Sequence, residues 1–407
     1  MEGSLSTNNW EKYELGEMAV EVRNLFEPVQ NEELPYIGLE HIDQNTLKFN
    51  SIGQSKDTVS TKKKFLPGDI LFGTLRPYFR KVVRPKFKGV CSTDITVVRA
   101  KENCTSGFLF YFIANHSFID YATSISTGTR MPRASWKTLS ESNWQFPPLP
   151  TQRKIAAILS AYDDLIENNL RRIKILEEMA QNLYREWFVK FRFPGHEQAR
   201  FVDSEMGRIP EGWEVKRLSE TCTLIMGQSP KSEFYNTIGA GLPFHQGVTD
   251  FGNRFPKDRM FCTVENRVAE PGDILFSVRA PVGRINLSDK KIVIGRGLSA
   301  IRENSGNQWF LFHFLKDKFQ KEDIMGGGAI FNSVTKNDME GIQILYPTQD
   351  IIDFFEGLAT PLNDKAGVLT KKNNSLRHTR DLLLPRLISG EVDVSDLDIN
   401  MPNENGL

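Results

Sequence analysis

Residues 151–189 read TQRKIAAILSAYDDLIENNLRRIKILEEMAQNLYREWFV, and their apolar spacing decides how the chain is organised. Alternating steps of four and three residues pick out one stripe: Tyr162, Ile166, Asn169, Ile173, Leu176, Ala180, Leu183 and Trp187. Asn169 is the one strongly polar member of this stripe. A stripe that continues in this way over several heptads is typical of a long helix that packs against another helix.

The same stripe recurs 200 residues later, at Leu362, Ala366, Leu369, Asn373, Leu376, Arg380, Leu383 and Leu387. Either copy alone would fit an ordinary helix that faces a core, but two copies favour two helices that pack together, with one Asn in each seam fixing the register. Ser160 and Thr360 are the expected N-caps, and Pro361 then takes the first helical position of the second copy. A helix of about 29 residues would be about 43 Å long, which is enough to hold two globular bodies apart.

The rest of the chain is also duplicated. The hexapeptide PGDILF occupies residues 67–72 and again residues 271–276. Collinear matches flank it: Trp10-Glu11 with Trp213-Glu214, Arg99 with Arg302, and Pro150-Thr151-Gln152 with Pro347-Thr348-Gln349. The chain is therefore read as two tandem copies of one body, each closed by a long helix, with a boundary near residues 193–196 where Pro and Gly end the first helix.

Each copy predicts mixed α and β structure. Ile70-Leu71-Phe72 is the expected buried strand, and residues 92–99 are a second strand because they are rich in β-branched side chains. The aromatic-rich residues 108–115 and 309–319 predict core helices rather than a stacking platform. Residues 126–130 and 326–329 predict loops in which the backbone turns tightly or approaches another group closely.

The composition indicates a protein of the cytoplasm. The chain has 407 residues, enough for two or three domains with cores of their own, and it contains no apolar run of the roughly 18 residues that a membrane span needs. Its four cysteines are scattered without a C-x-x-C pair, which favours reduced thiols over disulfides or a zinc site.

Charge is segregated along the chain although the net charge is zero. Residues 1–47 carry 2 basic and 10 acidic side chains, whereas residues 48–101 carry 13 basic and 3 acidic ones. The second copy repeats this pattern more weakly, with 10 basic and 5 acidic side chains in residues 254–302. Each copy thus has a basic middle that could contact a polyanion, although Lys62-Lys63-Lys64 alone would also fit a solvated lysine face.

Sequence signatures of catalysis are missing. There is no G-x-x-x-x-G-K-[ST] phosphate loop, and residues 146–149 (FPPL) lack the polar residue that precedes the two prolines in amino-methyltransferases. Asp203, Glu214 and Lys216 make a poor nuclease metal site, and the histidines form no helical i, i+4 pair. We therefore expect a non-catalytic chain that binds no metal or cofactor itself.

The duplicated body, the PGDILF hexapeptide, the Pro-Thr-Gln before each long helix and the ending RDLLLPRLISGEV (residues 380–392) together resemble the specificity subunit of type I restriction-modification enzymes. The resemblance covers nearly the whole chain. It implies an α+β fold with two tandem mixed α/β target-recognition domains, separated by two long antiparallel heptad helices in a pseudo-twofold internal duplication. The expected segments are residues 1–150 (first recognition domain), 151–192 (first spacer helix), 193–204 (linker), 205–347 (second recognition domain), 348–390 (second spacer helix) and 391–407 (tail).

The resemblance also implies partners. Each recognition domain would read one half of a split target in double-stranded DNA, and the paired helices would set the unread spacer. Two modification subunits would supply S-adenosylmethionine and the methyl transfer to adenine N6, and restriction subunits would add ATP- and Mg²⁺-dependent cleavage. No membrane partner is expected. The alternatives are a stand-alone regulator that binds a split operator and the DNA-binding part of a single-chain modifying nuclease; the absence of a catalytic signature counts against the latter.

Basic and amide side chains near the shared strand are the candidate DNA contacts, since Arg commonly reads guanine and Asn or Gln reads adenine, while Lys and Arg also bind phosphates. The candidates are Lys62, Lys63, Lys64, Arg76, Tyr78, Arg80, Lys81, Arg130 and Arg133 in the first copy and Arg279, Arg284, Arg296, Asn332 and Lys336 in the second.

Overall fold

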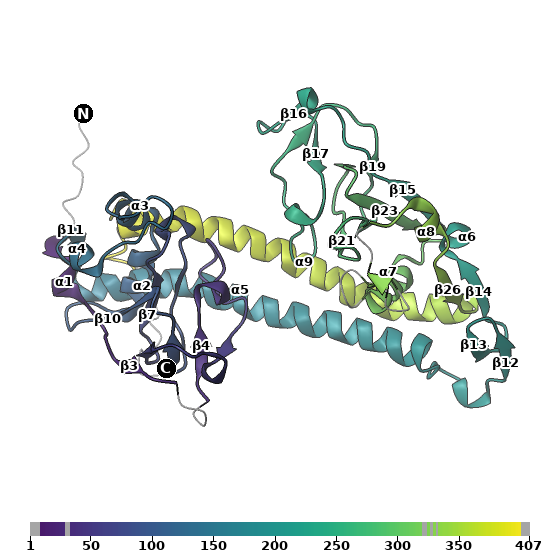
Figure 1. The fold of residues 1–407 in the computed structure, drawn as a ribbon, viewed down its shortest axis with the longest axis horizontal. Helices are drawn as coiled ribbons and strands as arrows, with labels where there is room; N and C mark the ends of the chain where they lie inside the picture. The colour runs from purple at the N-terminus through teal and green to yellow at the C-terminus, as the bar shows by residue number, and fades with distance from the viewer. Residues whose placement is uncertain (1–8, 29–32, 320–323, 326–328, 331–332, 400–407) are drawn as a thin grey trace. The chain divides into compact units, whose positions relative to one another are not determined.

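A computed structural model describes residues 9–28, 33–319, 324–325, 329–330 and 333–399. The chain forms two units (Figure 1): unit 1 comprises Met1–Glu167 and Asn374–Leu407, and unit 2 comprises Asn168–Asn373. The helices α5 (Leu149–Tyr184) and α9 (Gln349–Ile388) each contribute residues to both units. A π-helical turn, Arg185–Val189, follows α5.

Unit 1 contains a four-stranded sheet, a five-stranded sheet and a strand pair. The first sheet has the order β2 (Ala19–Glu21), β10 (Ile95–Ala100), β7 (Ile70–Gly73), β8 (Val82–Val83). The second has the order β3 (Leu25–Phe26), β6 (Lys62–Phe65), β9 (Gly89–Cys91), β4 (Pro35–Ile37), β5 (Gly53–Gln54), and the pair is β1 (Glu11–Glu14) with β11 (Asn143–Phe146). Its short helices are α1 (Leu15–Met18), α2 (Ser106–Ala114), α3 (His116–Ser124) and α4 (Trp136–Ser140).

Unit 2 repeats the four-stranded sheet, the five-stranded sheet and the strand pair of unit 1, and it has two further strand pairs. The four-stranded sheet has the order β15 (Cys222–Met226), β23 (Leu298–Glu303), β20 (Ile274–Ser277), β21 (Ile285–Leu287). The five-stranded sheet has the order β16 (Tyr235–Asn236), β18 (Phe261–Cys262), β17 (Leu242–His245), β22 (Ile292–Ile294), β19 (Val268–Ala269). Three strand pairs accompany them: β14 (Glu214–Arg217) with β26 (Gln343–Tyr346), β12 (Phe201–Ser204) with β13 (Gly207–Pro210), and β24 (Ile324–Met325) with β25 (Ala329–Ile330). The short helices are α6 (Leu218–Thr221), α7 (Gln308–Lys318) and α8 (Lys336–Glu340).

The repeated hexapeptide builds the same turn in both units. Gly68 and Gly272 adopt φ of 87° and 92°, a left-handed conformation that glycine reaches without a side-chain clash. The following Asp69 and Asp273 are each 2% exposed or less, and each carboxylate accepts two hydrogen bonds of 2.7 and 2.8 Å, from Arg99 and Arg302 respectively. Since both arginines lie on the strand beside the hexapeptide strand, one bidentate ion pair ties the two central strands together in each unit, and the predicted duplication is confirmed.

The aromatic segments form core helices, as predicted. Eight of the nine α2 residues, Gly107 to Ala114, are buried, and so are six residues of α7 from Phe310 to Leu315, because these segments are mostly apolar and lie inside their units. Both helices also carry one polar side chain toward a long helix. Tyr111 donates a 2.7 Å hydrogen bond to Asp163 of α5, and the His313 ring lies 3.1 Å from the Asn363 amide of α9.

The predicted heptad stripe is the buried face of the long helices. In unit 2, Ile173 of α5 packs against Ala366 and Leu369 of α9, and the order of these contacts makes the two helix segments antiparallel. In unit 1, Leu159 of α5 and Leu387 of α9 belong to one core. Arg380, the charged member of the second stripe, is 1% exposed and forms ion pairs with Asp163 and Asp381.

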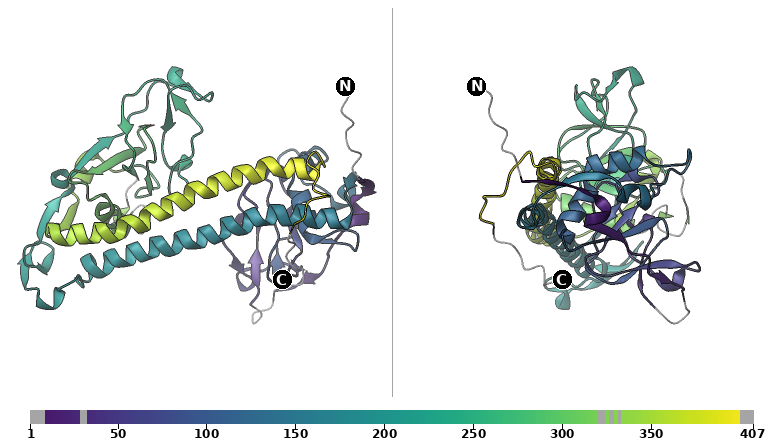
Figure 2. Two further views of the ribbon diagram at one scale, coloured as in Figure 1. Left: turned by 180° about the vertical axis from the view of Figure 1, so that it is seen from behind. Right: turned by 90° about the vertical axis from the view of Figure 1, so that its left-hand side faces the viewer.

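The expected helix starts were wrong. Both long helices begin about eleven residues before Ser160 and Thr360, which lie inside them, and Figure 2 shows α9 as one unbroken helix. The apolar stripe extends upstream through Ile155 and Leu159 in α5 and through Phe355 and Ala359 in α9, all of them buried. This packing outweighs the local N-cap signals. It also keeps α9 helical through Pro361, an exposed residue in the helix interior.

The second predicted strand is shorter than expected. The strand β10 begins at Ile95, because residues 92–94 form a turn that is closed by a 3.0 Å hydrogen bond from the Ile95 amide to the Ser92 carbonyl. Part of the second glycine loop, residues 326–328, and the candidate Asn332 lie outside the described residues.

Candidate nucleic-acid interface

The connection after the shared strand forms a strained loop in unit 1. Residues 74–81 join β7 to β8, and they include a 3-10 turn at Pro77–Phe79. Arg76 and Arg80 flank this turn with φ of 52° and 49°, a left-handed conformation that non-glycine residues adopt rarely. Tyr78, at the tip of the turn, is 46% exposed. Such backbone conformations persist where surrounding contacts hold them, and they are common in binding loops.

Arg80 is the anchor of this loop. Its side chain is 2% exposed, and its Nε donates a 2.6 Å hydrogen bond to the carbonyl of Ala114 at the end of α2. Burial lowers the pKa of the guanidinium. Lys81 likewise turns inward and donates from Nζ to the carbonyl of Leu39. The structure gives each of these residues a contact within the unit, and their predicted contacts with DNA stay predictions.

A second loop, residues 127–134, lies against the first. The Arg76 amide donates a 2.7 Å hydrogen bond to the Pro132 carbonyl, and its Nη2 lies 3.2 Å from the Arg130 carbonyl. Leu75 and Arg133 form a β-bridge. The predicted residues Arg76, Tyr78, Arg130 and Arg133 are therefore brought together at one place from two loops. Of these, Tyr78, Arg130 and Arg133 are exposed, and Arg133 pairs with Asp94.

Unit 2 repeats this pairing of loops. Arg279, in the connection between β20 and β21, forms a β-bridge with Ser333, and the Val334 amide donates a 2.8 Å hydrogen bond to the Val278 carbonyl. Arg279 and Arg284 are exposed. Lys336, the first residue of α8, is exposed and pairs with Glu340 at 3.2 Å.

The lysine run 62–64 is not a solvated face. Lys62 is 5% exposed, and its Nζ donates 2.7 Å hydrogen bonds to the carbonyl and hydroxyl of Ser60. Lys63 donates to the Ile95 carbonyl at 3.0 Å and lies 3.7 Å from a Glu21 carboxylate oxygen. Only Lys64 of the three keeps its ammonium outside such contacts within the described residues, where it lies 5.1 Å from the centre of the Phe26 ring. A DNA contact from these lysines stays a prediction.

Sequence reasoning missed a third loop in unit 2 that surrounds the predicted Arg296. The Arg296 amide donates to the Ser229 hydroxyl at 3.3 Å, and Gly295 and Gly297 donate backbone hydrogen bonds of 2.9 and 3.1 Å to His245 and Gln246. The loop also brings in Gln228, whose amide donates to Ile294 at 3.0 Å. The sequence signal for this loop was the Gly-Arg-Gly triplet at residues 295–297. Glycine is needed there because a Cβ on Gly297 would lie only 2.6 Å from the Gln246 carbonyl oxygen. Gln228, Gln246 and Arg296 are all exposed, and their side chains are of the types that read adenine and guanine.

The described residues show no arrangement for holding a metal. Within the described ranges, no group of three or more His, Cys, Asp or Glu side chains could ligate an ion. Cys91, Cys104, Cys222 and Cys262 are buried free thiols, and burial raises the pKa of Cys91, Cys104 and Cys222 to about 12. What the exposed loops offer is hydrogen-bond donors and positive charge. No helix in the described part of the chain is both long enough and apolar enough to cross a membrane.

Comparison with known proteins shows to which family the chain belongs. The family model described as "Type I restriction modification DNA specificity domain" matches residues 7–178 and again residues 210–375, so it covers most of the chain as two copies. The chain belongs to this family. A relative from Methanocaldococcus jannaschii, named as a putative type I restriction enzyme MjaX specificity subunit, is 29% identical over 406 residues, which is 95% of this chain and 94% of the relative.

Two other specificity subunits extend the likeness. The HindI specificity subunit of Haemophilus influenzae is 24% identical over 461 residues, which is 95% of this chain and all of the relative. The crystal structure of the S subunit of a type I restriction-modification system from M. genitalium has the same fold, with a TM-score of 0.58 at 15% identity, and the match covers 95% of this chain and 97% of that one. The predicted α+β fold with two tandem recognition domains and two long helices is confirmed.

Proposed function

We propose that this chain is the DNA specificity subunit of a type I restriction-modification complex, in which each unit reads one half of a split, asymmetric target. The observation that carries this proposal is the repeated loop cluster. Both units place the connection after the hexapeptide strand beside the loop that precedes a short helix, α4 or α8, and join the two by a β-bridge. Exposed arginines lie at this place in both units: Arg130 and Arg133 in unit 1, and Arg279 and Arg284 in unit 2.

The difference between the two clusters supports an asymmetric target. Unit 1 offers Tyr78 on a 3-10 turn and Arg130 and Arg133 on the second loop, whereas the unit 2 cluster has Arg279 and Arg284 and, on the neighbouring loop, Arg296 with two exposed glutamines. Base edges in the major groove are read by the identity and spacing of such donors, so different side chains on one scaffold give different half-sites. The scaffold itself, with its Asp-Arg ion pair and aromatic helix, is the same in both units.

Exposed apolar side chains on the long helices fit docking by protein partners. Ile175 and Met179 of α5 are 55% and 52% exposed, and Phe354 and Val368 of α9 are 51% and 59% exposed. Large apolar groups at such positions are typical of surfaces that a partner covers. We assign them to the modification subunits, two per chain, which would bring S-adenosylmethionine and the adenine-N6 methyl transfer. Restriction subunits would join for ATP- and Mg²⁺-dependent cleavage. The site of action is then the cytoplasm.

Co-expression with the modification subunit of the same operon tests this function. The purified complex should methylate one split sequence in plasmid DNA, and the subunit without this chain should methylate none. A chain that binds a split operator but recruits no methyltransferase would instead support a stand-alone regulator, the runner-up that the sequence left open.

A further inference from the structure

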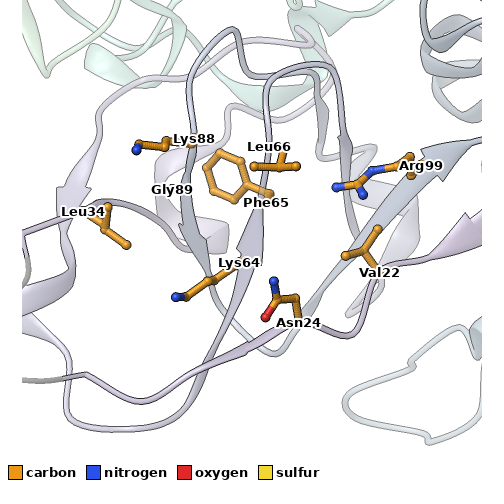
Figure 3. Close-up of a pocket in the computed structure, with 9 residues that line it drawn as sticks. All are labelled: Val22, Asn24, Leu34, Lys64, Phe65, Leu66, Lys88, Gly89 and Arg99. Atoms are coloured by element: carbon orange, nitrogen blue, oxygen red, sulfur yellow. The ribbon is translucent and has the colours of Figure 1, made fainter.

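The five-stranded sheet of unit 1 carries a pocket with positively charged walls (Figure 3). Its volume is about 240 Å³. Asn24, Lys64, Lys88 and Arg99 supply polar groups, Leu34 and Leu66 supply apolar wall, and no Asp or Glu of the described chain lines it. Figure 3 shows Lys64 and Lys88 on one side of the view and Arg99 on the other, with Phe65 and Leu66 between them. Lys64 is also a candidate DNA contact and Arg99 belongs to the Asp-Arg ion pair, but no ligand has been assigned to this pocket.

The positive charge of the pocket is only partly balanced. Arg99 pairs with Asp69 through its Nε and Nη2. Lys64 and Lys88, by contrast, form no ion pair with any described residue. Two ammonium groups beside a guanidinium in a concave, partly apolar setting repel one another, because the lower local dielectric strengthens the interaction between charges. An anion in the pocket would remove this repulsion.

In unit 2, a carboxylate of the chain itself lies at the equivalent place. Its strands β19 and β22 pair in the same register as β6 and β9, so Val268 stands where Lys64 stands, Glu270 where Leu66 stands and Lys291 where Lys88 stands. In unit 2 the Glu270 carboxylate lies 3.3 Å from Lys291 Nζ. The pKa of Arg302, the counterpart of Arg99, is raised by the hydrogen bonds that Arg302 donates to Asp273, and the charge of Glu270 adds to this rise. Unit 2 therefore supplies its own anion between the two basic groups.

Unit 1 lacks that carboxylate and has one more cation. Relative to unit 2, Leu66 in place of Glu270 removes one negative charge, and Lys64 in place of Val268 adds one positive charge, a difference of two charges. A phosphate monoester carries about 1.5 to 2 negative charges at pH 7, whereas a carboxylate or a DNA phosphodiester carries one. The two additional positive charges of unit 1 therefore match a phosphate monoester best.

We propose that this pocket binds a small phosphate monoester with an apolar body, of about the size of a mononucleotide. The phosphate lies between Lys64, Lys88 and the side of Arg99 that Asp69 leaves free, and the organic part lies against Leu34 and Leu66. The pocket volume is slightly below the usual range for ligand sites, roughly 300–1,000 Å³, which limits the ligand to a small one. The site is specific to unit 1, because unit 2 fills the same position with Glu270.

Titration of the full-length chain with adenosine monophosphate, followed by calorimetry and by ³¹P NMR of the ligand, tests the proposal. The chain should bind this probe, and should bind adenosine, which has no phosphate, at least roughly tenfold more weakly. Leu66→Glu copies the arrangement of unit 2, so it should fold normally and weaken the binding of adenosine monophosphate by roughly 100-fold. Leu66→Gln, which has the same size without the charge, should keep most of the affinity.

The second unit offers the reciprocal experiment. Val268→Lys together with Glu270→Leu should create a second site and raise the stoichiometry from one to two. No binding by the natural chain at millimolar probe, or equal binding by Leu66→Glu and Leu66→Gln, would overturn the proposal. A Leu66→Glu variant that changed only the affinity for duplex DNA would also overturn the proposal, because the pocket would then bind the phosphodiesters of the DNA backbone.

Discussion

Asn169 donates a 2.9 Å hydrogen bond from Nδ2 to Oδ1 of Asn373, and both side chains are buried in the apolar seam between α5 and α9 in unit 2. These are the two asparagines that interrupt the heptad stripes, and their side chains are hydrogen-bonded to each other. Sliding one helix along the other would leave both amides against apolar side chains, where an unpaired polar group costs about 1–3 kcal/mol. The pair therefore selects one register of the two helices.

The asparagine pair gives a prediction about stability. Asn169→Leu should lower the unfolding free energy by about 1–3 kcal/mol, because Asn373 loses the hydrogen bond from Asn169 inside the seam. The double variant with Asn373→Leu should recover most of this loss, since two leucines pack without a buried amide. Denaturant unfolding of both variants measures the effect. The neighbouring exposed Asn168→Leu is the matched control, with an expected change within about 0.5 kcal/mol; equal losses in the single and double variants would refute the pairing.

Glu356 predicts a pH dependence. Burial raises the pKa of this carboxyl from 4.5 to about 7, against the opposing hydrogen bond from the Phe310 amide at the start of α7. The folded state thus binds more protons than the unfolded state between pH 4.5 and about 7, so the stability from this group falls as pH rises through that window and stays low above it. Glu356→Gln should therefore raise the melting temperature at pH 8 and change it little at pH 4.5. An equal shift at both pH values would contradict this account.

The exposed arginines give a prediction about DNA binding by the assembled complex. Arg130→Ala and Arg279→Ala each remove one exposed cation from a loop cluster. If the lost contact is to a phosphate, the slope of log K against log salt should fall by about 0.9 with no change in the preferred sequence. If it is to a base, discrimination at one position should fall by about 1–3 kcal/mol. Lys62→Ala, which removes a buried lysine, is the comparison: a changed stability with an unchanged salt slope would show a structural role, and a lower slope would support its predicted DNA contact. Unchanged salt slope and specificity in both arginine variants would remove these loops from the interface.

Much of this fold could be predicted from the residues alone. The heptad stripe identified the buried faces of both long helices, and the hexapeptide identified the central strands and the duplication. Local signals failed where packing decides, as at Ser160 and Thr360, since a residue that favours an N-cap does not start a new helix where the apolar stripe continues on both sides of it. Charge counts could not predict the burial of Lys62 and Arg80, because a count of basic residues does not distinguish an exposed side chain from one that holds a loop; their contacts with DNA stay predictions.

The long helices carry a prediction about spacing in the target. Ile173 packs against Ala366 and Leu369, so a heptad inserted in α5 after Lys174 needs a matching heptad in α9 before Val368 to keep the seam in phase. The paired insertion adds about 10 Å of helix, equivalent to roughly three base pairs. We expect an active variant to methylate a target with a longer unread spacer and unchanged half-sites. An active variant with the original spacer would show that these helices do not set the distance.

The central claim is that each unit reads one half-site independently, and the methylated sequence of a domain exchange tests it most directly. Residues 1–150 are replaced by the matching segment of another type I specificity subunit, and the target is read by methylation-sensitive sequencing of host DNA. The account predicts that one half of the methylated sequence changes to that of the donor while the half read by unit 2 stays the same. A target in which both halves change, or neither does, would contradict it.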